Sequence, residues 1–119
     1  MVIDVGHAKT PDTKPTDTRE DLGCGIIISR GPNMNSKLTE KMIGRAREKE
    51  IKHQINVEPS GNSGTNARAF QVSRGGVATA VLGIPMRYMH SAHELINLDD
   101  LESAAQLMAE TAKMGENND

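Results

Sequence analysis

Short apolar runs alternate with segments of helical spacing along this chain, and that alternation constrains its fold more than any other feature. The runs with strand character are Val2–Val5, Gly25–Ser29, Ile51–Val57 and Val77–Pro85. The unbroken apolar stretch in the second run is typical of a strand that is buried on both faces. The sequence therefore predicts an α/β fold, a mostly parallel sheet with flanking helices.

Three segments are expected to be helical. The first begins at Ser36, whose hydroxyl can cap it, and ends near Glu50. The second covers Thr65–Ser73, with Ala67, Phe70 and either Ala69 or Val72 as its inward side chains. The third begins after a cap at Asn97, and one apolar face of it carries Leu101, Ala104, Ala105, Met108 and Ala112.

Composition excludes several classes of protein. The chain has 119 residues, a net charge of −2 and one cysteine, so a basic nucleic-acid surface and an intramolecular disulfide framework are both excluded. No apolar run approaches the ~18 residues of a membrane span, and we expect no membrane partner. Only 2% of the residues are aromatic, so the core rests on aliphatic side chains and the chain is expected to be a piece of a larger domain.

A few residues could carry chemistry, each with a plainer alternative. Asp4 lies in an apolar strand, where a carboxylate is costly unless it is paired or binds a metal, although it could simply accept backbone N–H groups. His90 and His93 would share a helical face and could ligate one ion, or could be surface residues. Cys24 could be a nucleophile or a small apolar side chain. The Gly61–Asn66 loop could hold an anion or merely turn the chain.

Several of these segments occur together in an order that resembles the C-terminal part of the glutamyl aminopeptidase family, cytosolic di-metal enzymes that include proteins named cellulase M or endoglucanase. The resemblance covers residues 2–114. Its most specific stretch is Ile84-Pro85-Met86-Arg87-Tyr88-Met89-His90-Ser91. The weaker segments are Val2-Ile3-Asp4-Val5-Gly6-His7-Ala8, Leu22-Gly23-Cys24-Gly25, Arg30-Gly31-Pro32-Asn33, Gly64-Thr65-Asn66-Ala67, Gly75-Gly76-Val77-Ala78-Thr79 and Leu98-Asp99-Asp100-Leu101-Glu102.

The resemblance implies roles for two residues of this chain. Asp4 matches a ligand of one metal ion and His90 a ligand of the other, while His7 and His93 inherit no role. The family's other ligands and its general-base Glu precede the segment that matches Asp4, so no catalytic residue is expected here. Two divalent ions, zinc or cobalt, are implied for the intact enzyme. Its substrates are peptides with a free N-terminus.

These implications give an expected organisation. Residues 1–114 are expected to form a partial catalytic domain that lacks its N-terminal half, and residues 115–119 a polar tail. The implied function is that of a cytoplasmic metalloaminopeptidase, a hydrolase, with this piece inactive alone. The alternatives are a non-catalytic remnant or a module that completes a split enzyme in trans. A glycosidase is the third reading, although its chemistry needs two suitably spaced carboxylates and usually an aromatic sugar platform. Relatives often assemble into large shells, which implies a homo-oligomer.

Overall fold

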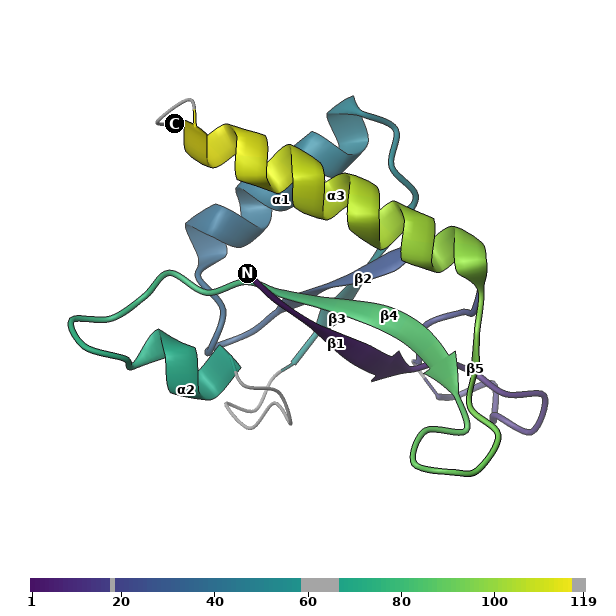
Figure 1. Ribbon diagram of the computed structural model, residues 1–119. Coiled ribbons are helices and arrows are strands. Elements are labelled where there is room, and N and C mark those ends of the chain that lie inside the picture. The colour runs from purple at the N-terminus through teal and green to yellow at the C-terminus, as the bar shows by residue number, and fades with distance from the viewer. Residues whose placement is uncertain (18, 59–66, 117–119) are drawn as a thin grey trace.

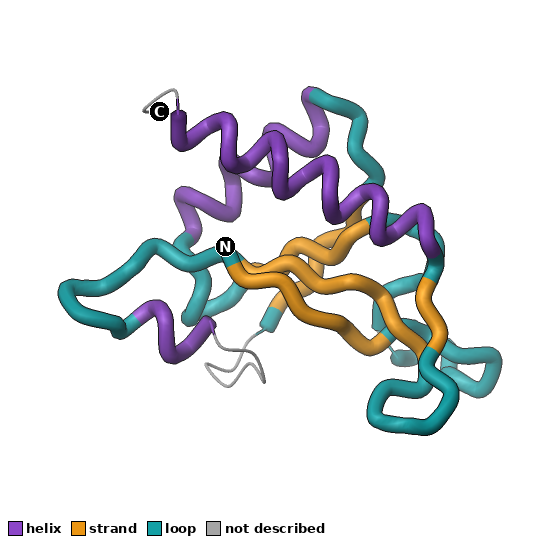
Figure 2. The backbone as a smooth tube through the Cα atoms, viewed as in Figure 1, coloured by secondary structure: helices purple, strands orange, loops and turns teal. Residues whose placement is uncertain are grey.

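The computed structural model describes residues 1–17, 19–58 and 67–116 (Figures 1 and 2). Strands and helices alternate along most of the chain, which confirms the predicted α/β class. In order the elements are β1 (Val2–His7), β2 (Ile26–Arg30), α1 (Ser36–Glu48), β3 (His53–Val57), α2 (Ala67–Gln71), β4 (Val81–Arg87), β5 (Leu95–Ile96) and α3 (Leu98–Glu116). None of the described helices is both long enough and apolar enough to cross a membrane.

The sheet consists of two parallel pairs joined by a short antiparallel contact. Its strand order is β1-β4-β2-β3, and β5 pairs with the far end of β4. β1 runs parallel to β4, and β2 runs parallel to β3. Between the pairs, Ile27 is opposite Gly83 and Ile28 is opposite Leu82 in antiparallel register. The parallel pairings predominate, as the alternation of strands and helices predicts.

Helices α1 and α3 cover one face of this sheet (Figure 1). The core lies between the helices and the sheet, where side chains from both are shielded from solvent. Its fully buried members include Ile26, Ile28 and Leu82 from the strands, Met42 and Ile43 from α1, and Leu107 from α3. An ion pair of 3.2 Å between Arg45 Nε and Glu110 Oε2 also links the two helices. α1 and α3 pack on one face of the sheet, and the site described below lies against the opposite face.

A buried carboxylate connects α3 to the turn before β2. Asp100 is fully buried, and its two oxygens accept the backbone N–H groups of Gly23 and Gly25, each at 2.8 Å. Both glycines have positive φ angles, 84° and 98°. A Cβ on Gly25 would lie 2.1 Å from the carbonyl oxygen of Lys52. The turn therefore depends on glycine for its shape and on Asp100 for its hydrogen bonds.

Local structure corrects the predicted element ends. Asn35, not Ser36, is the N-cap of α1, because its side chain accepts the N–H of Leu38 at 2.8 Å. The capping role of Asn97 is confirmed, since its side chain accepts the N–H of Asp99 at 2.8 Å. The fourth strand begins at Val81 instead of Val77.

The predicted inward faces of two helices are also corrected. Phe70 and Val72 are 52% and 74% exposed and do not enter the core. On α3 the buried positions are Asp100, Ser103, Ala104 and Leu107, whereas most of the predicted apolar face, including Leu101, is exposed. The buried face of α3 is thus rotated relative to the apolar face that the sequence indicates.

The Asp100 contacts give a stability prediction. Asp100→Ala should lower the free energy of unfolding by about 2–3 kcal/mol, because two backbone N–H groups lose their acceptor where water cannot freely replace it. Urea unfolding followed by circular dichroism measures this difference. The matched control Asp99→Ala removes an exposed carboxylate from the same helical turn. It should lower the free energy of unfolding by less than ~1 kcal/mol. Equal losses in the two variants would contradict the role given to Asp100.

Candidate metal-binding pocket

A pocket of about 550 Å³ lies against the sheet face opposite α1 and α3. Strand register places Asp4 and Ile27 on this face, since both are opposite Gly83, while the neighbouring residues Ile26, Ile28 and Leu82 belong to the core on the other side. Its lining comes from the four main strands and from four connecting segments: Asp4, Val5, Gly6, His7, Arg19, Glu20, Ile27, Ser29, Met34, Asn56, Glu58, Val81, Leu82, Gly83, Met89 and His90.

Glycines make room for the pocket beside Asp4. Gly83 is the partner of Asp4 on β4, and Gly6 follows two positions later on β1. A Cβ on Gly6 would lie 2.9 Å from Cδ1 of Ile27, so Ile27 occupies the space that these glycines leave. Beside Asp4 the floor of the pocket is therefore backbone and Ile27, and both polar and apolar residues line the rest of it.

Asp4 is exposed at the pocket, so the burial cost that its apolar strand suggested does not arise in this chain. Its Oδ1 accepts the N–H of Val5 at 2.8 Å. That hydrogen bond fixes one carboxylate oxygen and leaves the other without a described hydrogen bond. The plainer expectation, that Asp4 accepts a backbone N–H, is met, and the geometry also leaves an oxygen available to a ligand.

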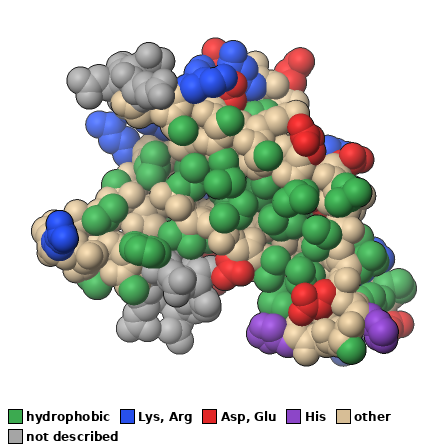
Figure 3. Space-filling model, in the orientation of Figure 1, with side chains coloured by type: hydrophobic (Ala, Val, Ile, Leu, Met, Phe, Trp, Pro, Cys, Tyr) green, Lys and Arg blue, Asp and Glu red, His purple; other side chains and the backbone are tan. Residues whose placement is uncertain are grey.

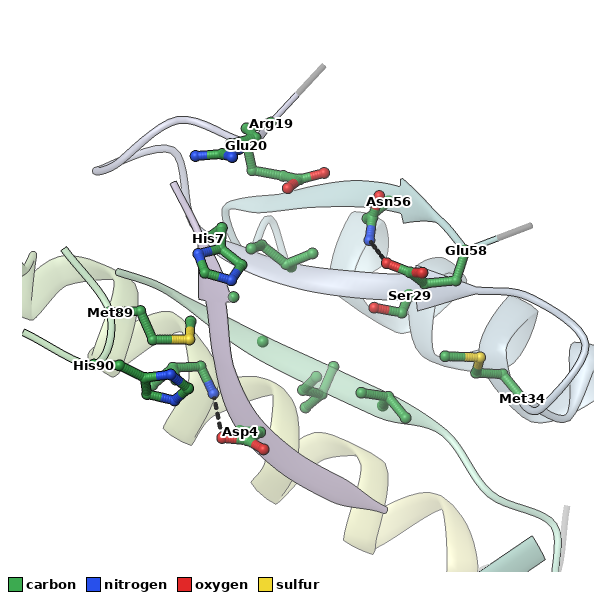
Figure 4. Close-up of a pocket in the computed structure, with 16 residues that line it drawn as sticks. Asp4, His7, Arg19, Glu20, Ser29, Met34, Asn56, Glu58, Met89 and His90 are labelled. Carbon is green, nitrogen blue, oxygen red and sulfur yellow. Dashed lines mark hydrogen bonds between the residues drawn. The ribbon is translucent and has the colours of Figure 1, made fainter. Parts of the chain in front are cut away.

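His90 reaches the same pocket from the turn after β4 (Figure 4). The segment is a turn instead of the helix in which His90 and His93 would share a face. Tyr88 and His90 have positive φ angles of 59° and 64°, and the N–H of His90 donates to Oε1 of Glu94 at 3.0 Å. His93 is not among the pocket residues. The turn thus separates the two histidines and directs only His90 to the pocket.

Asp4 and His90, the two candidate metal ligands, both line this pocket. Carboxylate oxygen and imidazole nitrogen are ordinary zinc donors, but a catalytic zinc ion normally has three protein ligands. Within residues 1–17, 19–58 and 67–116, no group of three or more His, Cys, Asp or Glu side chains is placed to hold an ion. The chemistry of these two donors fits the implied metals, zinc or cobalt. Two donors are, however, fewer than a catalytic ion normally has.

Two further carboxylates line the pocket and were not predicted. Glu20 and Glu58 both lie there, and the described salt bridges involve neither of them. The loop that carries Glu20 returns to the segment that follows β1, where the Glu20 carbonyl accepts the N–H of Lys9 at 2.8 Å. Burial raises the pKa of Glu20 above its ordinary 4.5, and the charges of Glu58 and Asp21 raise it further. No motif or periodicity in this loop indicates that it reaches the pocket.

The remaining predicted residues lie apart from this pocket or beyond the described part of the chain. Cys24 is exposed in the turn that Asp100 holds, and it is not a pocket residue. The Gly61–Asn66 loop lies outside the described residues. His7, for which the resemblance implied no role, does line the pocket.

Comparisons with known proteins identify a family and similar aminopeptidases. Residues 1–107 match the model of the M42 glutamyl aminopeptidase family. Lysyl aminopeptidase of Pyrococcus furiosus is 43% identical over 108 residues, which are 90% of this chain and 30% of that relative. This chain therefore spans less than a third of that relative's length.

Solved structures show the same fold. An aminopeptidase from Desulfurococcus kamchatkensis superimposes with a TM-score of 0.79 and 32% identity, over 92% of this chain and 32% of that one. The TET1 peptidase of Pyrococcus horikoshii, described as assembling into a tetrahedron or a large octahedral shell, gives a TM-score of 0.67 and 27% identity, over 91% and 31%. The sheet and its helices thus match one part of longer aminopeptidases.

The raised pKa of Glu20 gives a pH prediction. Below 4.5 the carboxyl is protonated in the folded and the unfolded chain, and its burial costs little. As the pH rises through the folded pKa, the unfolded chain loses its proton first and stability falls. Glu20→Gln should therefore gain stability relative to the wild type between pH 4.5 and neutrality, as measured by urea unfolding at several pH values.

The neighbouring carboxylate supplies the matched variant for that measurement. Glu58→Gln removes a charge that raises the pKa of Glu20. In a chain that already carries Glu58→Gln, the pH-dependent gain in stability from Glu20→Gln should therefore be smaller. A gain from Glu20→Gln that is identical at pH 4.5 and at neutrality would contradict the assigned burial.

Proposed function

The chain belongs to the M42 glutamyl aminopeptidase family, and from this we propose that it carries part of the active site of a cytoplasmic metalloaminopeptidase, which hydrolyses the N-terminal residue from peptides. Asp4 would hold one divalent ion and His90 the other, with zinc or cobalt as the metal. The observation that supports this proposal most directly is that both side chains line one pocket, although 86 positions separate them in the sequence.

The chain's own residues would position the ions and the substrate. The N–H of Val5 orients the carboxylate of Asp4, and the turn between β4 and β5 orients His90. When bound, the two ions would polarise the scissile carbonyl and lower the pKa of a water molecule. The further ligands and a general base would have to come from polypeptide outside these 119 residues, in the same chain or another.

We propose that the preferred N-terminal residue of the substrate is basic. The relative from Pyrococcus furiosus is a lysyl aminopeptidase. In this chain Glu20 and Glu58 line the same pocket as Asp4 and His90, and neither forms a described salt bridge. Arg19 also lines the pocket, but its guanidinium pairs with Asp17 at 3.4 Å. A lysine side chain that entered the pocket would be attracted by the carboxylates of Glu20 and Glu58, and a glutamate side chain would be repelled by them.

Two other functions are less well supported. A module that completes a split enzyme in trans would use the same residues, and it differs from the first proposal only in where the rest of the site comes from. A glycosidase would need two carboxylates about 5–9.5 Å apart across a sugar ring. It also usually needs aromatic stacking, and the chain has one Phe and one Tyr.

An activity assay tests the proposed function. The pure chain with zinc or cobalt should release no p-nitroaniline from lysyl, leucyl or glutamyl anilides, because two ligands and no base cannot complete the chemistry. A folded circular dichroism spectrum is the control for this negative result. Supplied with the part of the Pyrococcus furiosus relative that it does not match, the chain should become active, with lysyl anilide as the fastest substrate.

Two results of this assay would count against the proposal. Turnover by the pure chain that Asp4→Ala and His90→Ala each abolish would mean that the chain completes the site alone. A supplemented enzyme that prefers glutamyl anilide would contradict the role given to Glu20 and Glu58.

A further inference from the structure

Strand β3 is an edge of the sheet that exposes apolar side chains. The strand order β1-β4-β2-β3 leaves β1 and β3 at the two edges. On the face that Figure 3 shows, hydrophobic side chains gather over α3 and the strands beneath it. Two further exposed hydrophobic side chains belong to β3, where Ile55 is 37% and Val57 is 64% exposed. β3 therefore combines an open backbone edge with apolar side chains, the combination that favours pairing with another strand.

The backbone of β3 faces β2 on one side and no described strand on the other. Just after the strand, the N–H of Glu58 donates to the carbonyl oxygen of Arg30 at 2.7 Å, on the β2 side. Successive N–H groups of a strand point to opposite edges, so those of His53, Ile55 and Val57 point away from β2. A strand placed there would meet a row of backbone donors and acceptors in regular order.

Ile55 continues the apolar core layer to this edge. Its partner on β2 is Ile28, which is fully buried between the sheet and the helices. Residues paired across neighbouring strands point to the same face, so Ile55 and Val57 are on the helix side of the sheet. Edge strands that stay single are commonly protected by Lys, Pro or a bulge. The sequence of β3, His-Gln-Ile-Asn-Val, contains neither Lys nor Pro, so the strand itself carries no such protection against pairing.

We propose that the β3 edge is an interface between two copies of this chain, in which their β3 strands pair antiparallel with Ile55 opposite Ile55. The outward N–H and C=O groups are then in the positions that a hydrogen-bonded antiparallel pair requires. The two Ile55 side chains cover each other on the helix side. This inference does not depend on the proposed function. The other cross-strand pairs in this register are Gln54–Asn56, His53–Val57 and Lys52–Glu58.

Charge complementarity argues for a second copy as the occupant. Lys52 is exposed just before β3, and Glu58 directly follows the strand. The described salt bridges involve neither residue. Because Lys52 of each copy is opposite Glu58 of the other, symmetry gives both ends of the interface a pair of opposite charges. A strand of unrelated sequence would have to supply both charges at the same spacing.

The pairing also brings the second copy close to the pocket. Asn56 and Glu58 lie on the pocket side of β3, where Nδ2 of Asn56 donates to Oε1 of Glu58 at 3.1 Å (Figure 4). Lys52 of the second copy would share the Glu58 carboxylate with a basic substrate side chain. An exposed ion pair contributes little to affinity, so this contact selects the register, and the apolar side chains supply the buried area.

Sedimentation velocity over a concentration series measures this association in the 119-residue chain. The wild type should dimerise reversibly. Ile55→Lys should raise the dimer Kd by at least about tenfold, because it sets like charges opposite each other at the centre of the pairing. The matched control is Ile3→Lys on the other edge strand, where Ile3 is 39% exposed, and it should leave the Kd unchanged. Circular dichroism checks that both variants are folded.

A charge exchange tests the register of the two strands. Lys52→Glu should raise the dimer Kd by about fivefold, because it places like charges opposite each other at both ends of the interface. Adding Glu58→Lys to that variant should restore the wild-type Kd, since opposite charges then face each other again.

Disulfide trapping tests the same register without a change of charge. The chain first receives Cys24→Ser, which removes its one native cysteine. Ile55→Cys should then link two copies under mild oxidation, because Cα atoms directly opposite in such a pair are about 5.5 Å apart, within disulfide reach. Val57→Cys should link far more slowly although Val57 is more exposed, because the two copies of this residue would lie about 13 Å apart along the strands.

Several results would overturn the inference. A wild type that stays monomeric at every concentration, or equal Kd values for the wild type and Ile55→Lys, would exclude the β3 interface. Dissociation by Ile3→Lys instead of Ile55→Lys would move the contact to β1. Equal rates of disulfide formation for Ile55→Cys and Val57→Cys would exclude pairing about Ile55.

Discussion

The architecture depends on one short antiparallel contact between two parallel strand pairs. β2 and β4 meet where Ile27 is opposite Gly83, and that contact joins β1–β4 to β2–β3. Ile27 can pack there because Gly83 and Gly6 carry no side chain. The same contact forms the floor of the pocket beside Asp4. Without it the chain would hold two separate strand pairs, each too small to keep a stable sheet, and the candidate ligands would have no common surface.

Local patterns in the sequence predicted most of the sheet and both long helices, since apolar runs and caps act over a few residues. They could not distinguish Asn35 from Ser36 as a cap, because both side chains accept first-turn N–H groups equally well. Asp4 and His90 were each candidate ligands from the residues alone, but the resemblance to a family was needed to assign one metal ion to each of them. Glu20 was missed because the path of its loop is set by tertiary contacts, which leave no periodic signal.

The misjudged face of α3 is the most informative difference between sequence and structure. The sequence indicates an apolar face that includes Leu101, and in the chain that face is largely exposed. Apolar residues on a helix indicate the faces that pack against other structure, and they do not indicate which polypeptide that structure belongs to. In the described structure this apolar face of α3 is left uncovered, and so is the outer edge of β1, which pairs there with β4.

The central claim is that this chain holds half of a two-metal site. It is tested most directly by the zinc content of the chain, measured by mass spectrometry after gel filtration, alone and together with the complementary part of the Pyrococcus furiosus relative. The account predicts that the chain alone retains no zinc and that the complex retains two ions per chain. It also predicts that His90→Ala lowers the zinc content of the complex. Two ions retained by the chain alone, or none by a complex that has formed, would contradict it.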